Sequence, residues 1–151
     1  MSIIIFIIYF REIFMNNKND NILDNFLKEK DDHNFVLYVP EIIHTNWKIN
    51  ENGRVLLILE TNNPITKISS WLLKKKINKD IEFDELSTSA WLSIDGERCI
   101  FEIARLQKSK TDDTFKEALI RLIQFIHYIA KRRWIKYKKV KSKEEVNTSK
   151  L

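Results

Sequence analysis

The sequence has little glycine, proline or cysteine, and each shortage excludes a class of site or structure. Its 151 residues include two glycines, two prolines and one cysteine. Two isolated glycines cannot form a Gly-rich phosphate-binding loop, and long flexible linkers are not expected. The single Cys99 excludes an internal disulfide and a cysteine-based zinc site, and it favours a reducing, cytoplasmic setting.

Histidine is equally sparse, and the pattern does not indicate catalysis. The three histidines, His33, His44 and His127, are scattered and lack the spacing of metal ligands. Cys99 lies at the start of a predicted helix with no obvious base beside it. We therefore expect a protein that is not an enzyme and that holds no metal and no cofactor.

The basic charge is concentrated at the C-terminal end of the chain. Residues 131–151 contain nine basic and two acidic residues, a net charge of +7, so the other 130 residues carry −2 of the total +5. Such a segment could attract nucleic acid, an acidic peptide or an anionic membrane. The favoured interpretation is a solvated, disordered basic tail over residues 138–151.

No hydrophobic run is long enough to span a membrane. The apolar run at residues 2–10 is less than half of the roughly 20 residues that a spanning helix needs, and no basic region precedes it. It could be a buried strand or short helix, or a weak membrane-surface anchor. The favoured interpretation is that residues 1–14 are translated upstream sequence and that the natural start is Met15.

The middle of the chain predicts a small antiparallel sheet. Residues 47–60 read as a hairpin, with Asn52 and Gly53 suited to a type I′ turn. The apolar run 55–59 predicts a strand that is buried on both faces. Residues 78–83 can supply a third strand, and a short helix is plausible within residues 65–77.

Three helices follow the predicted sheet. Asp84 is a good N-cap for a helix at residues 85–94, and Gly96 suits the position that ends it. Further helices are expected at residues 100–108 and 114–133, and residues 134–140 either return as a short strand or fray. The fold class is therefore α+β, a small sheet followed by three helices.

These residues resemble the PqqD family, in its firmicute-type branch. The matching residues are Phe83, Asp84, Leu86, Ala90, Trp91, Ile94, Asp95, Gly96, Arg98, Ile103, Leu106, Phe125 and Ile135. The resemblance covers about residues 41–137, after an N-terminal extension over residues 1–40. Cys99 stands where the family usually has a threonine N-cap, and residues 61–78 look like an insertion.

The resemblance implies a winged helix-turn-helix fold, also called a RiPP recognition element. Such a protein is a peptide chaperone that binds the leader of a ribosomally made precursor peptide. It presents the peptide to a modifying enzyme, often a radical SAM protein. In the family the leader adds as an extra strand beside the third strand, against the third helix.

The third strand and third helix contain matching candidate contacts. Besides the core-facing residues of the last helix, Ile120, Ile123 and His127 form a second apolar band. Either this band contacts a peptide, or it packs against the N-terminal extension or the insertion. The predicted peptide-binding residues are Asp80, Ile81, Glu82, Phe83, Lys116, Ile120, Ile123, His127 and Lys131.

DNA binding is the alternative function, because winged helices also read DNA. In that case the helix at 100–108 would enter the major groove. Its expected exposed residues, Glu102, Arg105, Gln107 and Lys108, offer few phosphate contacts. Nucleic acid is therefore the less favoured partner.

Overall fold

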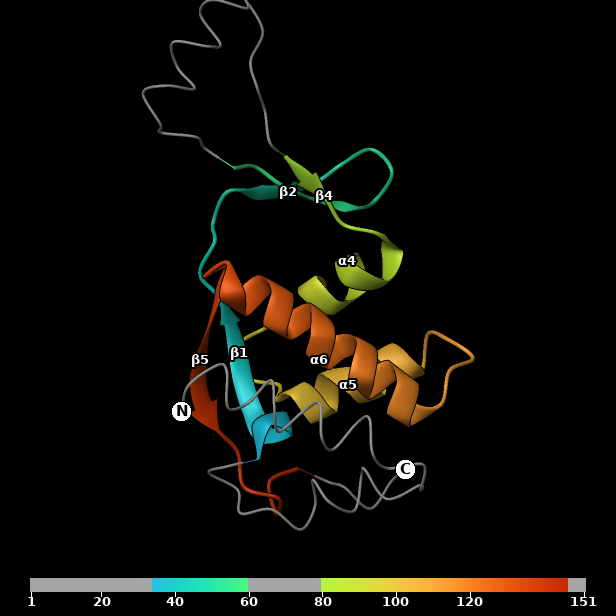
Figure 1. The fold of residues 1–151 in the computed structure, drawn as a ribbon, viewed down its shortest axis with the longest axis vertical. Helices are drawn as coiled ribbons and strands as arrows, with labels where there is room; N and C mark the ends of the chain where they lie inside the picture. Colours follow the sequence, from blue (N-terminus) through green and yellow to red (C-terminus); the bar gives the residue numbers. More distant parts are fainter. Residues whose placement is uncertain (1–33, 60–79, 147–151) are drawn as a thin grey trace, which may run out of the picture.

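The computed structural model describes residues 34–59 and 80–146. The predicted helix within residues 65–77, the proposed insertion and residues 147–151 lie outside this part. The elements are a 3₁₀ turn η2 (Phe35–Leu37), β1 (Tyr38–Ile42), β2 (Trp47–Ile49), β3 (Val55–Leu57), β4 (Ile81–Glu82), α4 (Glu85–Leu92), α5 (Ile100–Lys108), α6 (Phe115–Lys131) and β5 (Ile135–Val140). The α+β class is confirmed, with a small sheet followed by three helices (Figure 1).

The three-stranded sheet has the order β2–β3–β4, and both pairs are antiparallel. The predicted hairpin and third strand are therefore confirmed. In β3 the side chains of Val55 and Leu57 are fully buried, whereas Leu56 between them is half-buried. The prediction of burial on both faces is wrong, because successive side chains point to opposite faces and only one face meets the core.

The turn of this hairpin differs from the predicted type I′ geometry. That turn needs positive φ at both central residues, but of the pair only Gly53 has it, at 74°. The Gly53 N–H donates to the carbonyl of Asn50, and the Asn50 N–H donates to the carbonyl of Arg54. This is a three-residue loop with a glycine bulge, which Asn50 Oδ1 supports by accepting from the N–H groups of Asn52 and Arg54.

The predicted N-cap of α4 is confirmed, and α6 also begins with a side-chain cap, one residue after its predicted start. Asp84 Oδ1 accepts the Ser87 N–H at 2.7 Å, and Thr114 and Glu117 form a reciprocal capping box. Gly96 does not end α4 as predicted, because α4 ends at Leu92 with Ser93 as its cap. Gly96, at φ 75°, instead lies in the turn where Asp95 Oδ1 accepts two backbone N–H groups.

A second, two-stranded sheet joins the two ends of the described chain. β1 pairs with β5 in antiparallel register, and the pair runs along one side of α6 (Figure 1). Val36, Leu37 and Val39 are buried, so the core begins before residue 41, within the stretch predicted as an N-terminal extension. Likewise, residues 138–140 of the predicted tail belong to β5, and Val146 is buried.

One ion pair fixes the chain just beyond β5 to the start of α5. Lys141 Nζ lies 2.8 Å from Glu102 Oε2, which also accepts the Cys99 N–H at 2.8 Å. Partial burial opposes ionisation of Glu102, but these hydrogen bonds outweigh it and hold the pKa of this carboxyl below its ordinary value. Glu102 therefore supports the N-terminus of α5, where the Cys99 thiol is a weak cap.

The last helix ends in a left-handed residue that is not glycine. Arg133 has φ 60°, its N–H donates to the Ala130 carbonyl, and the Trp134 N–H donates to the Ile129 carbonyl. These two bonds form a Schellman motif with Arg133 at the position where glycine is preferred. The motif turns the chain from α6 directly into β5.

Replacing Arg133 with glycine should therefore stabilise the protein. Relief of the left-handed strain predicts a gain of up to about 1 kcal/mol in the free energy of unfolding, measured by urea denaturation. Arg133→Val should lower stability instead, because a β-branched side chain tolerates positive φ poorly. A loss of stability in Arg133→Gly would contradict this explanation of the helix end.

Candidate functional site

β4 forms an edge of the three-stranded sheet in the part of the chain that the structure describes. The Phe83 N–H donates to the Val55 carbonyl at 2.9 Å, so Phe83 is a hydrogen-bonded partner of β3. In antiparallel sheets such positions alternate with positions whose N–H and C=O point away. The backbone of Glu82 therefore faces outward from β4, while its side chain pairs with Arg54 at 3.3 Å.

The four predicted contact residues on and next to β4 differ in how far they are exposed. Glu82 is exposed, and Asp80 and Ile81 are half-buried, so all three remain accessible. Phe83 is only 5% exposed and belongs to the core. Its ring lies 5.4 Å from Phe125 and 5.6 Å from Trp91, between centroids, so it cannot contact a peptide directly.

The two flanks of α6 face different parts of the molecule. Phe125 lies on the flank that meets Phe83, beside β4. His127 lies on the opposite flank, where its ring is 5.0 Å from Phe35 of η2. The predicted band shares the His127 flank by helical spacing, so the structure does not bring it together with β4.

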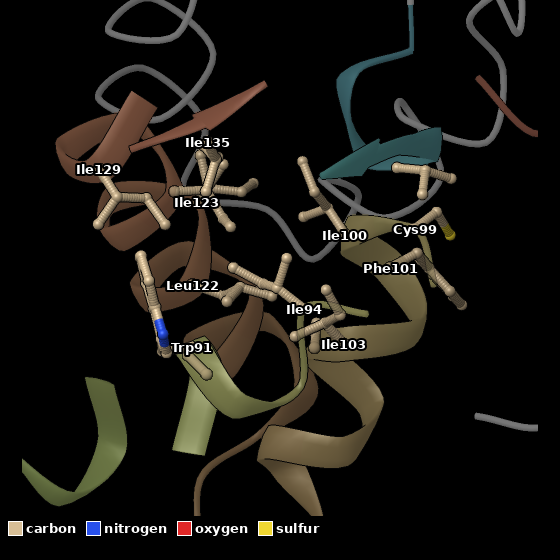
Figure 2. Close-up of a cluster of buried hydrophobic side chains, with 14 of the residues drawn as sticks. Trp91, Ile94, Cys99, Ile100, Phe101, Ile103, Leu122, Ile123, Ile129 and Ile135 are labelled. Carbon is tan, nitrogen blue, oxygen red and sulfur yellow. The ribbon is translucent and has the colours of Figure 1, made fainter. Parts of the chain in front are cut away.

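Burial within that band also varies. Ile123 is 1% exposed, and it points into the core near Ile135 (Figure 2). Ile120 and Lys116 are half-buried, and Lys131 is exposed. Ile123 is thus a core residue in this structure, and the alternative that the band packs against N-terminal residues is realised at His127 through Phe35.

His127 is half-buried against Phe35, whose ring also contacts Tyr38 and Tyr137. Phe35 lies 5.8 Å from Tyr38 and 5.7 Å from Tyr137, between ring centroids. Burial lowers the pKa of His127 below its ordinary value, because an apolar setting disfavours the imidazolium. This side of α6 is therefore packed against η2, β1 and β5.

A small pocket lies between α4 and α6, next to the point where the chain leaves β4. Its volume is about 100 Å³. The lining residues are Asp84, Leu86, Ser87 and Ala90 of the α4 segment, Gln107 of α5, and Ala118, Arg121, Leu122 and Phe125 of α6. The sequence reasoning missed this pocket, although the spacing of Ala118, Arg121 and Phe125 could have indicated a second flank.

The charged groups at the rim of the pocket already form an ion pair or hydrogen bonds. Arg121 Nη2 lies 2.6 Å from Asp113 Oδ2. Hydrogen bonds from the Ser87 backbone and side chain, with smaller contributions from Arg54 and Arg121, hold the pKa of Asp84 below its ordinary range. At neutral pH the rim therefore holds the Arg121–Asp113 ion pair and, at Asp84, an ionised carboxylate that caps α4.

The described residues contain no group of three or more His, Cys, Asp or Glu side chains that could hold a metal ion. Burial raises the pKa of the Cys99 thiol to about 12, which keeps it protonated and unreactive at neutral pH. Across residues 34–59 and 80–146, no helix is both long and apolar enough to cross a bilayer.

Comparisons of the chain with family models, with curated proteins and with solved structures find no match.

The burial difference between Ile123 and Ile120 is directly testable. Ile123→Asp should lower the free energy of unfolding by several kcal/mol, or prevent folding, because an unpaired carboxylate would be buried. Ile120→Asp, on the same flank but only half-buried, should lower the free energy of unfolding much less. Chemical denaturation followed by tryptophan fluorescence compares the two, and equal small losses would contradict the core assignment of Ile123.

Proposed function

We propose that this protein is a non-catalytic adaptor that binds the leader region of a ribosomally synthesised precursor peptide. It presents that peptide to a modifying enzyme, for example a radical SAM protein, in the biosynthesis of a peptide natural product. In this proposal the β2–β3–β4 sheet and the helices α4, α5 and α6 correspond to the winged helix-turn-helix of the PqqD family, which the sequence resembles.

The observation that carries the proposal is the outward-facing backbone of Glu82 on β4. An extended peptide can add to such an edge through main-chain hydrogen bonds, while neighbouring side-chain pockets provide specificity. Phe83, which follows the edge strand, contacts Phe125 of α6, and the next residue, Asp84, lines the pocket between α4 and α6. We therefore assign the peptide contacts on α6 to the Phe125 flank in place of the His127 flank.

The exposed surface of α5 supports this function over DNA binding. Glu102, which would face the duplex in a DNA reader, is held by Lys141 and the Cys99 N–H. Gln107 is buried at 4% exposure, and Leu106 places an apolar side chain on the outer surface. A helix with this surface offers little for base edges or phosphates.

The test uses a matched pair of substitutions at Glu82. Glu82→Pro removes the outward N–H without removing a bond to β3, whereas Glu82→Ala keeps that N–H. Both lose the Arg54 ion pair, so the pair isolates the backbone donor. We expect Glu82→Pro to bind a fluorescent leader peptide about tenfold more weakly than Glu82→Ala, by anisotropy, since one main-chain hydrogen bond and close strand contact are lost.

The probes are the leader of a small precursor peptide encoded beside the gene and a random DNA duplex, each at low and moderate salt. Saturable leader binding that survives moderate salt supports the adaptor. Tight, salt-sensitive DNA binding with no leader affinity would replace it with a DNA-binding function. Circular dichroism of both variants checks that the fold is intact.

A further inference from the structure

The two ends of the charge scale are separated along the described chain. Residues 131–146 contain eight basic and two acidic residues, a net charge of +6, whereas residues 34–59 and 80–130 contain eight basic and twelve acidic residues, a net charge of −4. The basic segment begins at the last residue of α6 and includes all of β5. The positive charge therefore belongs to one surface and is not a property of the whole molecule.

Most cations on this surface have no acidic partner to neutralise them. Five exposed side chains form what we call the basic strip: Arg132, Arg133, Lys136, Lys138 and Lys139. Within the described residues only Lys136 among them has an ion pair, with Glu41 Oε2 at 2.8 Å. Glu97 and Glu145 line a hollow at the β5 end of the strip, but neither forms an ion pair with it in the described chain. The strip thus keeps a surplus of positive charge for an outside partner.

β5 also presents an unpaired backbone edge within the described chain. Its sheet has the order β1–β5, so β5 has one neighbouring strand. The Trp134 carbonyl accepts from the residue that follows β1, and the Lys141 N–H donates to the Leu37 carbonyl, both on the β1 side. Because backbone groups alternate in direction along a strand, those of Ile135 and Val140 point away from β1. A polypeptide can form main-chain hydrogen bonds with these groups, whereas a nucleic acid has no matching ladder.

The aromatic rings that the structure describes near the strip are already covered or packed. Arg132 covers the face of Tyr128, with its guanidinium carbon 3.5 Å from the ring centroid. Trp134 is only 6% exposed, and Tyr137 packs against Tyr38 at 5.5 Å between centroids. Single-stranded nucleic acid is usually held by base stacking on exposed rings, so the strip favours a polypeptide over nucleic acid.

We propose that the basic strip and the β5 edge form a docking surface for an acidic, extended segment of a partner protein. Carboxylates of the segment lie opposite the lysines, while its backbone continues the β1–β5 sheet. A second copy of this chain is disfavoured, because two β5 strands would bring lysines together. The identity of the partner rests on the proposed function. An adaptor needs a surface for the modifying enzyme that leaves the leader site free, and β5 belongs to a different sheet from β4 (Figure 1).

The probe for this surface is a fluorescent peptide in which glutamate alternates with threonine, titrated into the full-length protein and followed by anisotropy. Its matched control has glutamine in place of each glutamate, and a random DNA duplex is the third probe. We expect the glutamate peptide to bind at least about tenfold more tightly than the glutamine peptide and to protect the Val140 amide from hydrogen exchange. Tighter binding of the duplex than of the glutamate peptide, or an unprotected Val140 amide at saturation, would overturn the proposal.

Substitutions locate the surface. Lys138→Glu with Lys139→Glu should weaken binding of the glutamate peptide by about tenfold or more, because two charges are reversed where the segment lies. Lys48→Glu with Lys108→Glu is the matched control, since both side chains are exposed outside β5 and the net charge changes equally. Its binding should stay within about twofold of the original protein, because distant charges are screened. Equal losses in the two double variants would overturn the proposal, and circular dichroism checks that both are folded.

The docking surface and the leader site fail separately. A saturating leader peptide should leave binding of the glutamate peptide unchanged, and the Lys138→Glu, Lys139→Glu variant should bind the leader normally. Displacement of the glutamate peptide by the leader would overturn the separate docking surface and leave the adaptor function standing. A protein that binds the glutamate peptide but no leader would overturn the adaptor function and leave the docking surface standing.

Discussion

The aromatic cluster around Phe83 holds the three-stranded sheet against the helices, and the geometry of the candidate site depends on it. Phe83 follows β4 directly and contacts Trp91 of α4, Phe125 of α6 and Trp134 ahead of β5. Trp47 of β2 adds a contact to Trp91. β4 has two residues, and the strands of the β2–β3 hairpin have three each, so the sheet is too small to be stable alone. The ring contacts therefore fix where the β4 edge lies.

The two flanks of α6 are therefore surrounded by different elements. The β1–β5 sheet and η2 cover the flank that carries His127, and Ile123 is buried at the boundary of that contact. The opposite flank, with Phe125 and Arg121, remains beside β4 and the pocket. The pairing of β1 with β5 therefore covers one flank of α6 and leaves the other beside β4, where we propose that the peptide binds.

Much of the fold was predictable because its signals are local. Asp84 and Thr114 act as caps through contacts three residues away, and the loop that contains Gly53 marks the hairpin. The pairing of β1 with β5 was not predictable, since it joins segments about a hundred residues apart and neither has a distinctive pattern. The turn type also escaped prediction, because an Asn-Gly pair suits more than one loop length.

The candidate site was predicted only in part, for a related physical reason. Charged residues on a short strand indicated the β4 edge, and that edge is present in the described chain. On α6, apolar residues flank the core face on both sides, and periodicity cannot tell which flank meets the sheet. Phe83 was misplaced because alternation along two strand residues does not reveal that the following residue turns inward to the core.

Peptide binding at the β4 edge is tested most directly by hydrogen exchange, followed by NMR, with and without the leader peptide. We expect the amide of Glu82 to become protected when the leader binds, and resonances of Phe125 to shift while those of His127 do not. Protection confined to α5 or β5, or an unchanged Glu82 amide at saturating leader, would contradict binding at the β4 edge.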